Sequence, residues 1–188
     1  MVRHKYDSRE AYKDGILAEE LYKLSCEHRG ISLGSVTVEQ NCSGIDYFKG
    51  QKKIDVKSRK RKKPPHMATI ELSAAKKSIG TGWAYKDTYT AQMMVYEDNE
   101  MIKDVIFGEF YNPDLLENLL NKKVDFIDRV EVQTLYKVRA RYFKGEHCGD
   151  TTLVTYDDLE SLETFTILQI PREYWDRIIE RYEYKGIL

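Results

Sequence analysis

The chain has 188 residues, of which 32% are charged and 41% are hydrophobic, and its formal net charge is −1. This length and composition predict one folded domain over residues 1–188 and argue against disorder. No apolar run approaches the ~20 residues of a membrane-spanning helix, and no apolar segment of a signal peptide follows Met1. We therefore expect an intracellular, cytoplasmic protein that does not enter a membrane.

The three cysteines, Cys26, Cys42 and Cys148, are far apart and form no Cys-x-x-Cys pair. Neither a disulfide framework nor a zinc site is predicted by such spacing. Buried or free thiols are the expected state of all three.

The first predicted element is a helix over residues 8–28, which ends just before Gly30. At about 100° per residue, Glu20 falls inside an apolar arc on this helix, whereas Glu19 falls outside it. The arc is made of Ile16, Leu17, Leu21 and Leu24. Because burying an unpaired carboxylate costs free energy, Glu20 is expected to meet a metal ion, a hydrogen-bond donor or a cation, or to form a salt bridge at the rim of the core.

Residues 35–39 have the composition of a strand, and Glu39 is a further acid there; residues 41–44 follow as a loop. The next stretch, residues 43–57, predicts a β-hairpin, because two β-rich runs flank a Gly-x pair. A two-residue loop that starts at Gly50 sets Asp46 opposite Asp55 across the ladder.

Side chains two positions apart on a strand share a face, so Asp46, Asp55 and Lys57 are predicted to project together. Opposed carboxylates repel, and a hard divalent cation between them would relieve the repulsion. The pattern predicts a site for Mg²⁺, with Mn²⁺ as the alternative, in which the backbone carbonyl of Val56 could add a ligand. Lys57 is placed to orient a nucleophilic water or to stabilise a charged transition state.

These residues resemble the active-site pattern of the PD-(D/E)XK nuclease superfamily. That pattern has an acid before an Asp-x-Lys on the next strand of a hairpin, and another acid on a preceding helix. Asp46 matches its first Asp, Asp55 its second acid and Lys57 its lysine, while Ile45 stands where the motif has proline. The resemblance covers roughly the first half of the chain.

The resemblance assigns the helical acid to Glu20, with Glu19 as the second choice and Glu39 as the remaining acid. It implies a restriction-endonuclease-like α/β fold, with a central mixed β-sheet flanked by helices. It also implies Mg²⁺-dependent hydrolysis of DNA phosphodiester bonds, and small enzymes of this superfamily often act as homodimers.

A basic tract leaves the strand that carries Asp55. Residues 52–63 contain eight basic residues and one acid, a net charge of +7, which leaves −8 for the rest of the chain. Lys and Arg replace counterions along nucleic acids, so the tract is expected to contact DNA phosphates. A solvated loop or a localisation signal is the alternative. The tract consists of Arg59, Lys60, Arg61, Lys62 and Lys63.

The second half of the chain predicts strands and two helices. One helix begins with Asn112 at the N-cap and Pro113 at its first position, and another follows Pro171 with a continuous apolar face. The predicted strands cover residues 68–72, 88–96, 101–107, 130–143 and 164–170. No internal repeat or Gly-rich phosphate loop is present in the sequence.

Two further functions fit the sequence besides a metal-dependent DNA endonuclease. One is a nucleic-acid-binding or protein-interaction module that keeps the fold without the chemistry. The other is a mimic or inhibitor that binds a basic protein through the acids Asp157, Asp158, Glu160 and Glu163.

Overall fold

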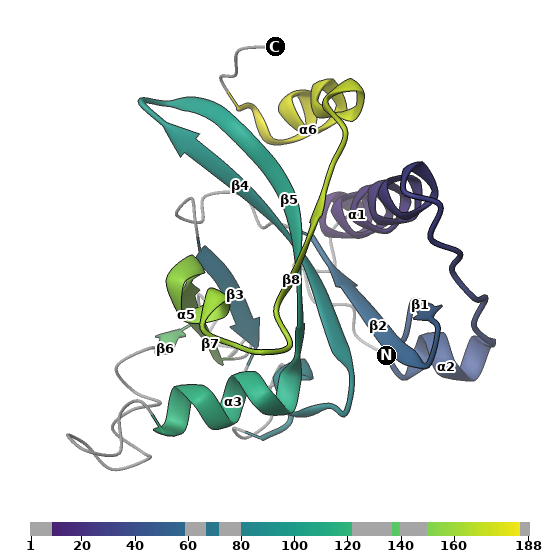
Figure 1. Ribbon diagram of the computed structural model, residues 1–188, viewed down its shortest axis with the longest axis vertical. Helices are drawn as coiled ribbons and strands as arrows, with labels where there is room; N and C mark the ends of the chain where they lie inside the picture. The colour runs from purple at the N-terminus through teal and green to yellow at the C-terminus, as the bar shows by residue number, and fades with distance from the viewer. Residues whose placement is uncertain (1–8, 59–66, 72–79, 122–136, 140–149, 185–188) are drawn as a thin grey trace. The chain divides into compact units, whose positions relative to one another are not determined.

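The computed structural model describes residues 9–58, 67–71, 80–121, 137–139 and 150–184. Helices accompany a five-stranded mixed sheet and a three-stranded sheet, which confirms the mixed α/β class (Figure 1). The chain divides into two compact units. Unit 1 is drawn from residues 1–66, 90–109 and 166–188, and unit 2 from residues 67–89 and 110–165. In the part of the chain that the structure describes, no helix is long and apolar enough to cross a membrane.

Unit 1 begins with helix α1, Arg9–His28, close to its predicted bounds. Gly30 ends it in a left-handed conformation, with φ of +69°. The Gly30 N–H donates to the carbonyl of Glu27, and the Ile31 N–H to that of Cys26, both at 2.9 Å. These two bonds form a Schellman motif and satisfy carbonyls at the helix end.

The buried face of α1 differs from the predicted apolar arc. Its buried side chains are Ala18, Leu21, Tyr22, Ser25 and Cys26, while Ile16 is exposed. At 100° per residue, Glu19 lies at the edge of this face and Glu20 on the opposite side. The predicted burial of Glu20 is therefore wrong. Tyr22 belongs to the buried face of the helix because its ring stacks on that of Tyr47, with centroids 5.9 Å apart, and meets the Phe107 ring edge-on at 5.2 Å.

The five-stranded sheet has the order β1-β2-β4-β5-β8. Its strands are β1 Tyr47–Lys49, β2 Lys52–Lys57, β4 Tyr89–Asp98, β5 Met101–Tyr111 and β8 Thr166–Gln169. β1 pairs with β2 and β5 with β8, both antiparallel. Asn99 and Glu100, between β4 and β5, have φ of 50° and 62°, as a two-residue type I′ hairpin turn requires. The predicted strands at residues 88–96, 101–107 and 164–170 are confirmed with shifted ends.

The C-terminal helix α6, Trp175–Tyr182, follows a short 3₁₀ turn, η2, Arg172–Tyr174, after Pro171. Trp175, Ile178 and Tyr182 are buried. Their spacing is that of one helical face, so the apolar face predicted from the sequence is confirmed.

A buried carboxylate, Glu109, lies inside unit 1 with polar partners from three other segments. The Lys49 ammonium contacts both of its oxygens, at 2.8 and 2.9 Å. The Tyr22 hydroxyl donates to Glu109 at 2.9 Å and the Thr166 hydroxyl at 3.4 Å. A buried charge is tolerated only when it is paired and hydrogen-bonded. These contacts therefore link Lys49 of β1, Tyr22 of α1 and Thr166 of β8 to Glu109 of β5.

A short helix, α2 Val38–Cys42, stands where the sequence predicts a strand over residues 35–39. Thr37 is its N-cap, and the Thr37 backbone N–H donates to the side-chain oxygen of Gln40 at 2.8 Å. This capping box is the start signal that outweighs the β-branched composition of the segment.

Unit 2 contains a three-stranded sheet of order β3-β7-β6, with β7 antiparallel to both neighbours. Its elements are β3 Met67–Glu71, η1 Trp83–Tyr85, α3 Asn112–Asn121, β6 Lys137–Arg139, β7 Asp150–Thr155 and α5 Tyr156–Glu160. The strand predicted at residues 68–72 and the helix predicted at Asn112 are confirmed. Of the run over residues 130–143 only β6 is described.

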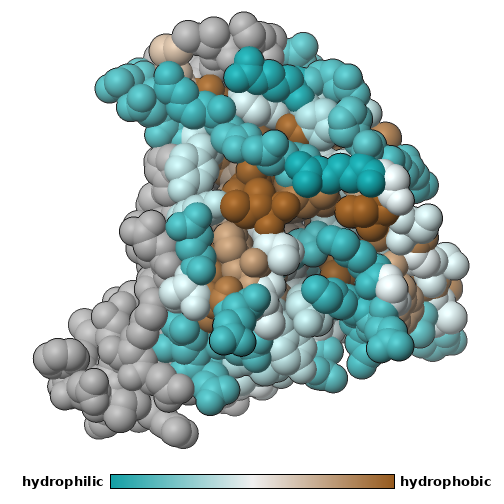
Figure 2. All heavy atoms as spheres, in the orientation of Figure 1, coloured by the Kyte–Doolittle hydropathy of each residue, from teal (hydrophilic) through white to brown (hydrophobic). Residues whose placement is uncertain are grey.

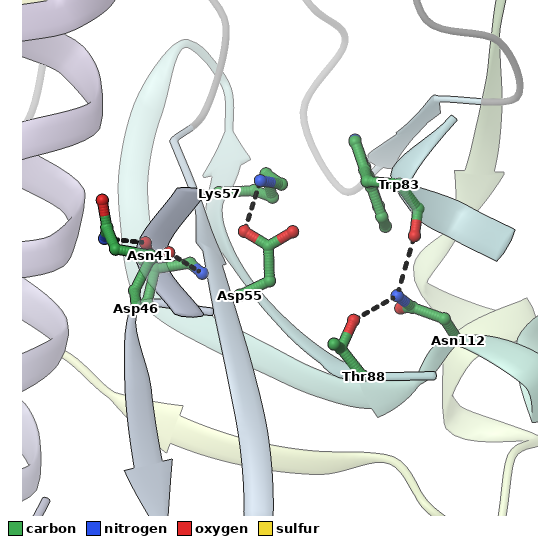
Figure 3. Close-up of polar contacts among 8 residues, drawn as sticks. Asn41, Asp46, Asp55, Lys57, Trp83, Thr88 and Asn112 are labelled. Atoms are coloured by element: carbon green, nitrogen blue, oxygen red, sulfur yellow. Dashed lines mark hydrogen bonds and ion pairs between the residues drawn. The ribbon is translucent and has the colours of Figure 1, made fainter. Parts of the chain in front are cut away.

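The buried Asn112 side chain acts as a clamp inside unit 2. Its amide nitrogen donates to the Trp83 carbonyl and to the Thr88 hydroxyl, both at 3.1 Å (Figure 3). The sequence predicts Asn112 as an N-cap, but α3 already includes it. The side chain instead ties the start of this helix to η1 and to the residue before β4.

Hydrophilic residues predominate on the face shown in Figure 2, and hydrophobic residues reach that surface in separate patches. Among the residues that the structure describes, the exposed large hydrophobic side chains are Tyr12, Ile16, Val38, Tyr85 and Ile167. Single exposed hydrophobic residues are normal for a folded protein and indicate no particular partner.

Candidate active site

The β1-β2 hairpin has the loop that the sequence predicts. Lys49 pairs with Lys52, and Phe48 pairs with Lys53. Gly50 has a φ of +61°, which suits the first position of a tight hairpin turn.

The ladder changes at Asp46. The Asp46 N–H donates to the carbonyl of Ile54 at 2.8 Å, although Ile54 is the register partner of Tyr47. Two residues thus face one, as in a β-bulge, a feature common next to active sites. The predicted placement of Asp46 directly opposite Asp55 is therefore wrong.

The bulge turns the Asp46 carboxylate toward the backbone of β2. Oδ2 accepts the Val56 N–H at 2.7 Å, and Oδ1 accepts the side-chain amide of Asn41, from α2, at 3.4 Å (Figure 3). Because the N–H and C=O of one strand residue point to the same neighbouring strand, the Val56 carbonyl is turned to the Asp46 side as well. Asp46 and the Val56 carbonyl, two of the predicted metal ligands, thus lie on the same side of β2.

Asp55 and Lys57 point to the same side of β2, as predicted, and form an ion pair (Figure 3). The Asp55 side chain is 1% exposed and that of Lys57 is 28% exposed. An acid so deeply buried is stable as an anion only beside positive charge or hydrogen-bond donors. The Lys57 ammonium supplies that charge.

Glu19 on α1 is an acid whose pKa is changed by the charges of Asp46, Asp55 and Lys57. Partial burial is the main cause that raises the pKa of Glu19 above its usual value, and the charges of Asp46 and Asp55 raise it further, while Lys57 lowers it. The Tyr47 hydroxyl donates to the Glu19 carbonyl at 3.2 Å, which holds this part of α1 on the hairpin. Three carboxylates and one lysine therefore act on one another in unit 1.

Glu20, the first choice for the helical acid, is not brought to this cluster. It pairs with Arg177 of α6 at 2.6 Å, and its side chain is 51% exposed. Glu39 is exposed in the first turn of α2, where a backbone N–H and the Thr37 hydroxyl lower its pKa by hydrogen bonding. Glu19 is therefore the acid that the structure couples to Asp46 and Asp55, whereas Glu20 pairs with Arg177.

Sequence reasoning missed Tyr47 and Asn41 as parts of the site. Burial raises the pKa of Tyr47 to about 12, and the charges of Glu19 and Asp46 add to the rise. Tyr47 is therefore a neutral hydrogen-bond donor between the helix and the hairpin. Its position next to Asp46 is visible in the sequence, whereas the role of Asn41 depends on α2, where the sequence predicts a strand and a loop.

The donor set suits a hard cation. Mg²⁺ is commonly held by one or two carboxylates and several waters, and carbonyl oxygens suit it too. Glu19, Asp46, Asp55 and the Val56 carbonyl are of these types. Burial is the main cause of the raised pKa of Glu19, and a cation would offset the smaller part of the rise that comes from the charges of Asp46 and Asp55. As the side chains stand, no group of three or more His, Cys, Asp or Glu residues among those described is arranged to hold a metal ion.

The basic tract, Arg59 to Lys63, lies outside the described residues, as does Cys148. Cys26 is buried and Cys42 is exposed, and both are free thiols. Burial raises the pKa of the Cys26 thiol to about 11, so it is not a reactive thiolate near neutral pH.

No family model, no curated protein and no solved structure matches this chain.

Proposed function

We propose that this protein is a metal-dependent endonuclease that hydrolyses DNA phosphodiester bonds, with a restriction-endonuclease-like site in unit 1. The observation that carries the proposal is the electrostatic coupling of Glu19 to Asp46, Asp55 and Lys57. These four residues come from one helix and one hairpin, and they are the residue types that the PD-(D/E)XK pattern uses.

In this proposal Asp46, Asp55 and Glu19 hold Mg²⁺ or Mn²⁺, together with the Val56 carbonyl and water. The bound ion would lower the pKa of a coordinated water and neutralise charge that builds on the scissile phosphate. Glu19 replaces Glu20 in this role because Glu20 is committed to Arg177.

Lys57 orients the attacking water and stabilises the developing negative charge on the phosphate. Its ion pair with Asp55 keeps the ammonium close to the acids, and its side chain is 28% exposed. Tyr47 and Asn41 are positioning residues, since they bond to the Glu19 backbone and to the Asp46 carboxylate.

DNA is the proposed substrate because the superfamily that the motif resembles acts mainly on DNA. The tract Arg59, Lys60, Arg61, Lys62 and Lys63 directly follows this strand in the sequence and supplies the charge to hold phosphates. A homodimer would bring two such sites to the two strands of a duplex.

The experiment that tests this proposal is incubation of the full chain with supercoiled plasmid, single-stranded DNA, branched DNA and RNA. Each substrate is tested with Mg²⁺, with Mn²⁺ and with EDTA. Cleavage of a DNA substrate that requires the metal supports the proposal. Cleavage that survives EDTA would remove the metal from the argument, and cleavage of RNA alone would change the substrate class.

One observation favours a second candidate, a nucleic-acid-binding module without chemistry. Lys57 forms an ion pair with Asp55, and no three of the described acids are arranged to hold one metal ion. A module of this kind would retain DNA in EDTA without cutting it, and Asp55→Ala would leave its affinity unchanged. For the nuclease, metal should enhance DNA binding in the parent and not in Asp55→Ala.

A further inference from the structure

A second feature of unit 1 that the proposed nuclease does not use is a pocket of about 380 Å³. Three segments far apart in the sequence line it: His28 and Arg29 at the end of α1, Lys103 and Asp104 in β5, and residues 169–172 with Trp175, where β8 leads to α6. The volume falls within the range of small-ligand pockets.

Trp175, the large apolar side chain that lines the pocket, is held by packing and by a hydrogen bond. The Trp175 side chain is 2% exposed, and its indole N–H donates to the Ile170 carbonyl at 3.0 Å. The Ile170 N–H in turn donates to the Val105 carbonyl of β5 at 3.0 Å. A ligand would therefore meet a surface that is already formed.

Three cationic side chains line the same pocket as Trp175. The Arg172 guanidinium lies over the Trp175 ring, 5.2 Å from its centroid, which orders the side chain without consuming its N–H groups. No ion pair or hydrogen bond among the described residues engages the Arg29 guanidinium. Lys103 has only a 4.0 Å approach to Asp98, with both side chains more than half exposed, and such pairs contribute little.

The one carboxylate of the pocket, Asp104, is already engaged locally. One of its oxygens accepts the Val105 N–H at 2.8 Å and the other the Gln169 side-chain amide at 3.3 Å. With three cationic side chains and this one carboxylate, the lining carries an excess of positive charge. The C-terminal dipole of α1 opposes an anion, but it amounts to about half a charge at most, and the Schellman motif satisfies the carbonyls of Cys26 and Glu27.

We propose that this pocket binds a phosphate group of a phosphorylated ligand through Arg29, Lys103 and Arg172. Two guanidinium groups match the oxygens of a phosphate in bidentate fashion, and Lys103 adds a point charge. The His28 ring adds a further polar group at the rim. Space beyond one phosphate leaves room for the group that carries it. This site does not depend on the proposed nuclease activity.

The test measures binding in EDTA, so that metal at the acidic site cannot contribute. Isothermal titration calorimetry with inorganic pyrophosphate, and fluorescence anisotropy with a short single-stranded DNA, are applied to the parent and to Arg29→Gln/Arg172→Gln. The matched control is Lys13→Gln/Lys23→Gln, which removes the same charge from α1 outside this pocket. Circular dichroism verifies that both variants are folded.

We expect the pocket variant to weaken binding of at least one probe tenfold or more, and the control variant to weaken it less than threefold. A loss limited to pyrophosphate identifies a free phosphate compound as the source, and a loss limited to DNA identifies a backbone phosphate. The proposal is overturned if the parent binds neither probe at millimolar concentration. It is also overturned if the pocket and control variants change affinity equally.

Discussion

Glu19 is the residue of helix α1 whose carboxyl interacts electrostatically with the charged residues of the β1-β2 hairpin. It lies at the edge of the buried face of α1, and its carbonyl accepts the Tyr47 hydroxyl. The negative charges of Asp46 and Asp55 both raise the pKa of its carboxyl. In the proposed site this carboxylate would contribute to metal binding through its charge and not through packing, so its role can be separated from folding.

The first prediction compares the two neighbouring acids of α1. Glu19→Gln should lower the rate of metal-dependent DNA cleavage by roughly 10–100-fold, because it removes a carboxylate near the metal. Glu20→Gln is the matched control and should stay within about twofold of the parent. Cleavage rates under single-turnover conditions measure both. Equal losses in the two variants would show that Glu19 has no special role.

The second prediction concerns pH. The pKa of Glu19 is raised from 4.5 in the folded protein, so its contribution to stability is present at low pH and is lost as pH rises through the folded pKa. Without metal, Glu19→Gln should therefore melt higher than the parent at pH 7, by roughly 1–3 °C, and no higher at pH 4. Thermal melts in EDTA across this range measure the difference. A variant that is less stable at pH 7 contradicts the sign.

At the scale of residues, the sequence predicts that Asp55 and Lys57 share a face of the strand, but not which side of α1 is buried. Asp55 and Lys57 follow from the period of a strand alone. The choice between Glu19 and Glu20 depends on which side of α1 is buried, and Tyr22 decides that through contacts with Tyr47 and Phe107. The position of such partners cannot be calculated from helical periodicity.

At the scale of elements, the hairpin is fixed from its turn end. Lys49 flanks the Gly50 turn and reaches the buried Glu109 of β5. Beyond this anchor the bulge at Asp46 redirects its carboxylate to the Val56 N–H. The anchored turn leaves the acids at the opposite end of the hairpin in a defined geometry.

The third prediction tests this anchor. Lys49→Met should destabilise the protein by about 3 kcal/mol, since it leaves Glu109 as a buried anion without its cation. In a Glu109→Gln background the same change should cost less than about 1 kcal/mol. Urea denaturation of the four proteins measures the coupling, and Lys53→Met, on the exposed part of the same hairpin, is the control. Equal costs in both backgrounds would show that the pair is not coupled.

Elements with strong local signals are predictable from this sequence, and those set by remote partners are not. The Gly50 turn and the helix after Pro171 follow from local chemistry. The bulge at Asp46 goes with a hydrogen bond from the Val56 N–H to the Asp46 carboxylate, ten residues away in the sequence, and no local signal indicates that contact. The helix α2 could have been found from Thr37 and Gln40, since the capping box is a local signature.

At the scale of the whole molecule, charge is divided unevenly along the chain. Residues 52–63 carry a net +7 and the remainder −8. An acidic protein with one dense basic segment should approach nucleic acid through that segment, because the rest repels phosphate. Salt dependence is the measurable sign of such binding.

The fourth prediction changes the tract by replacing Arg59, Lys60, Arg61 and Lys62 with Gln. The slope of log K against log salt should flatten by about 0.9 for each phosphate of duplex DNA that the variant no longer neutralises. Affinity should fall most at low salt. Titrations at several salt concentrations measure it, with Lys57→Ala for comparison, which should lose cleavage and keep its affinity. An unchanged slope in the Gln variant would make the tract a solvated loop or a localisation signal.

The measurement that tests the central claim most directly is the single-turnover cleavage rate of plasmid DNA in Mg²⁺ for Asp46→Asn and Asp55→Asn, with Asp104→Asn as the control. We expect each of the first two substitutions to lower the rate by roughly 10³-fold, because the metal's several kcal/mol of transition-state stabilisation are removed. Asp104→Asn should leave the rate within about twofold of the parent. If Asp46→Asn and Asp55→Asn cut as fast as the parent, the site assigned here is not the nuclease centre.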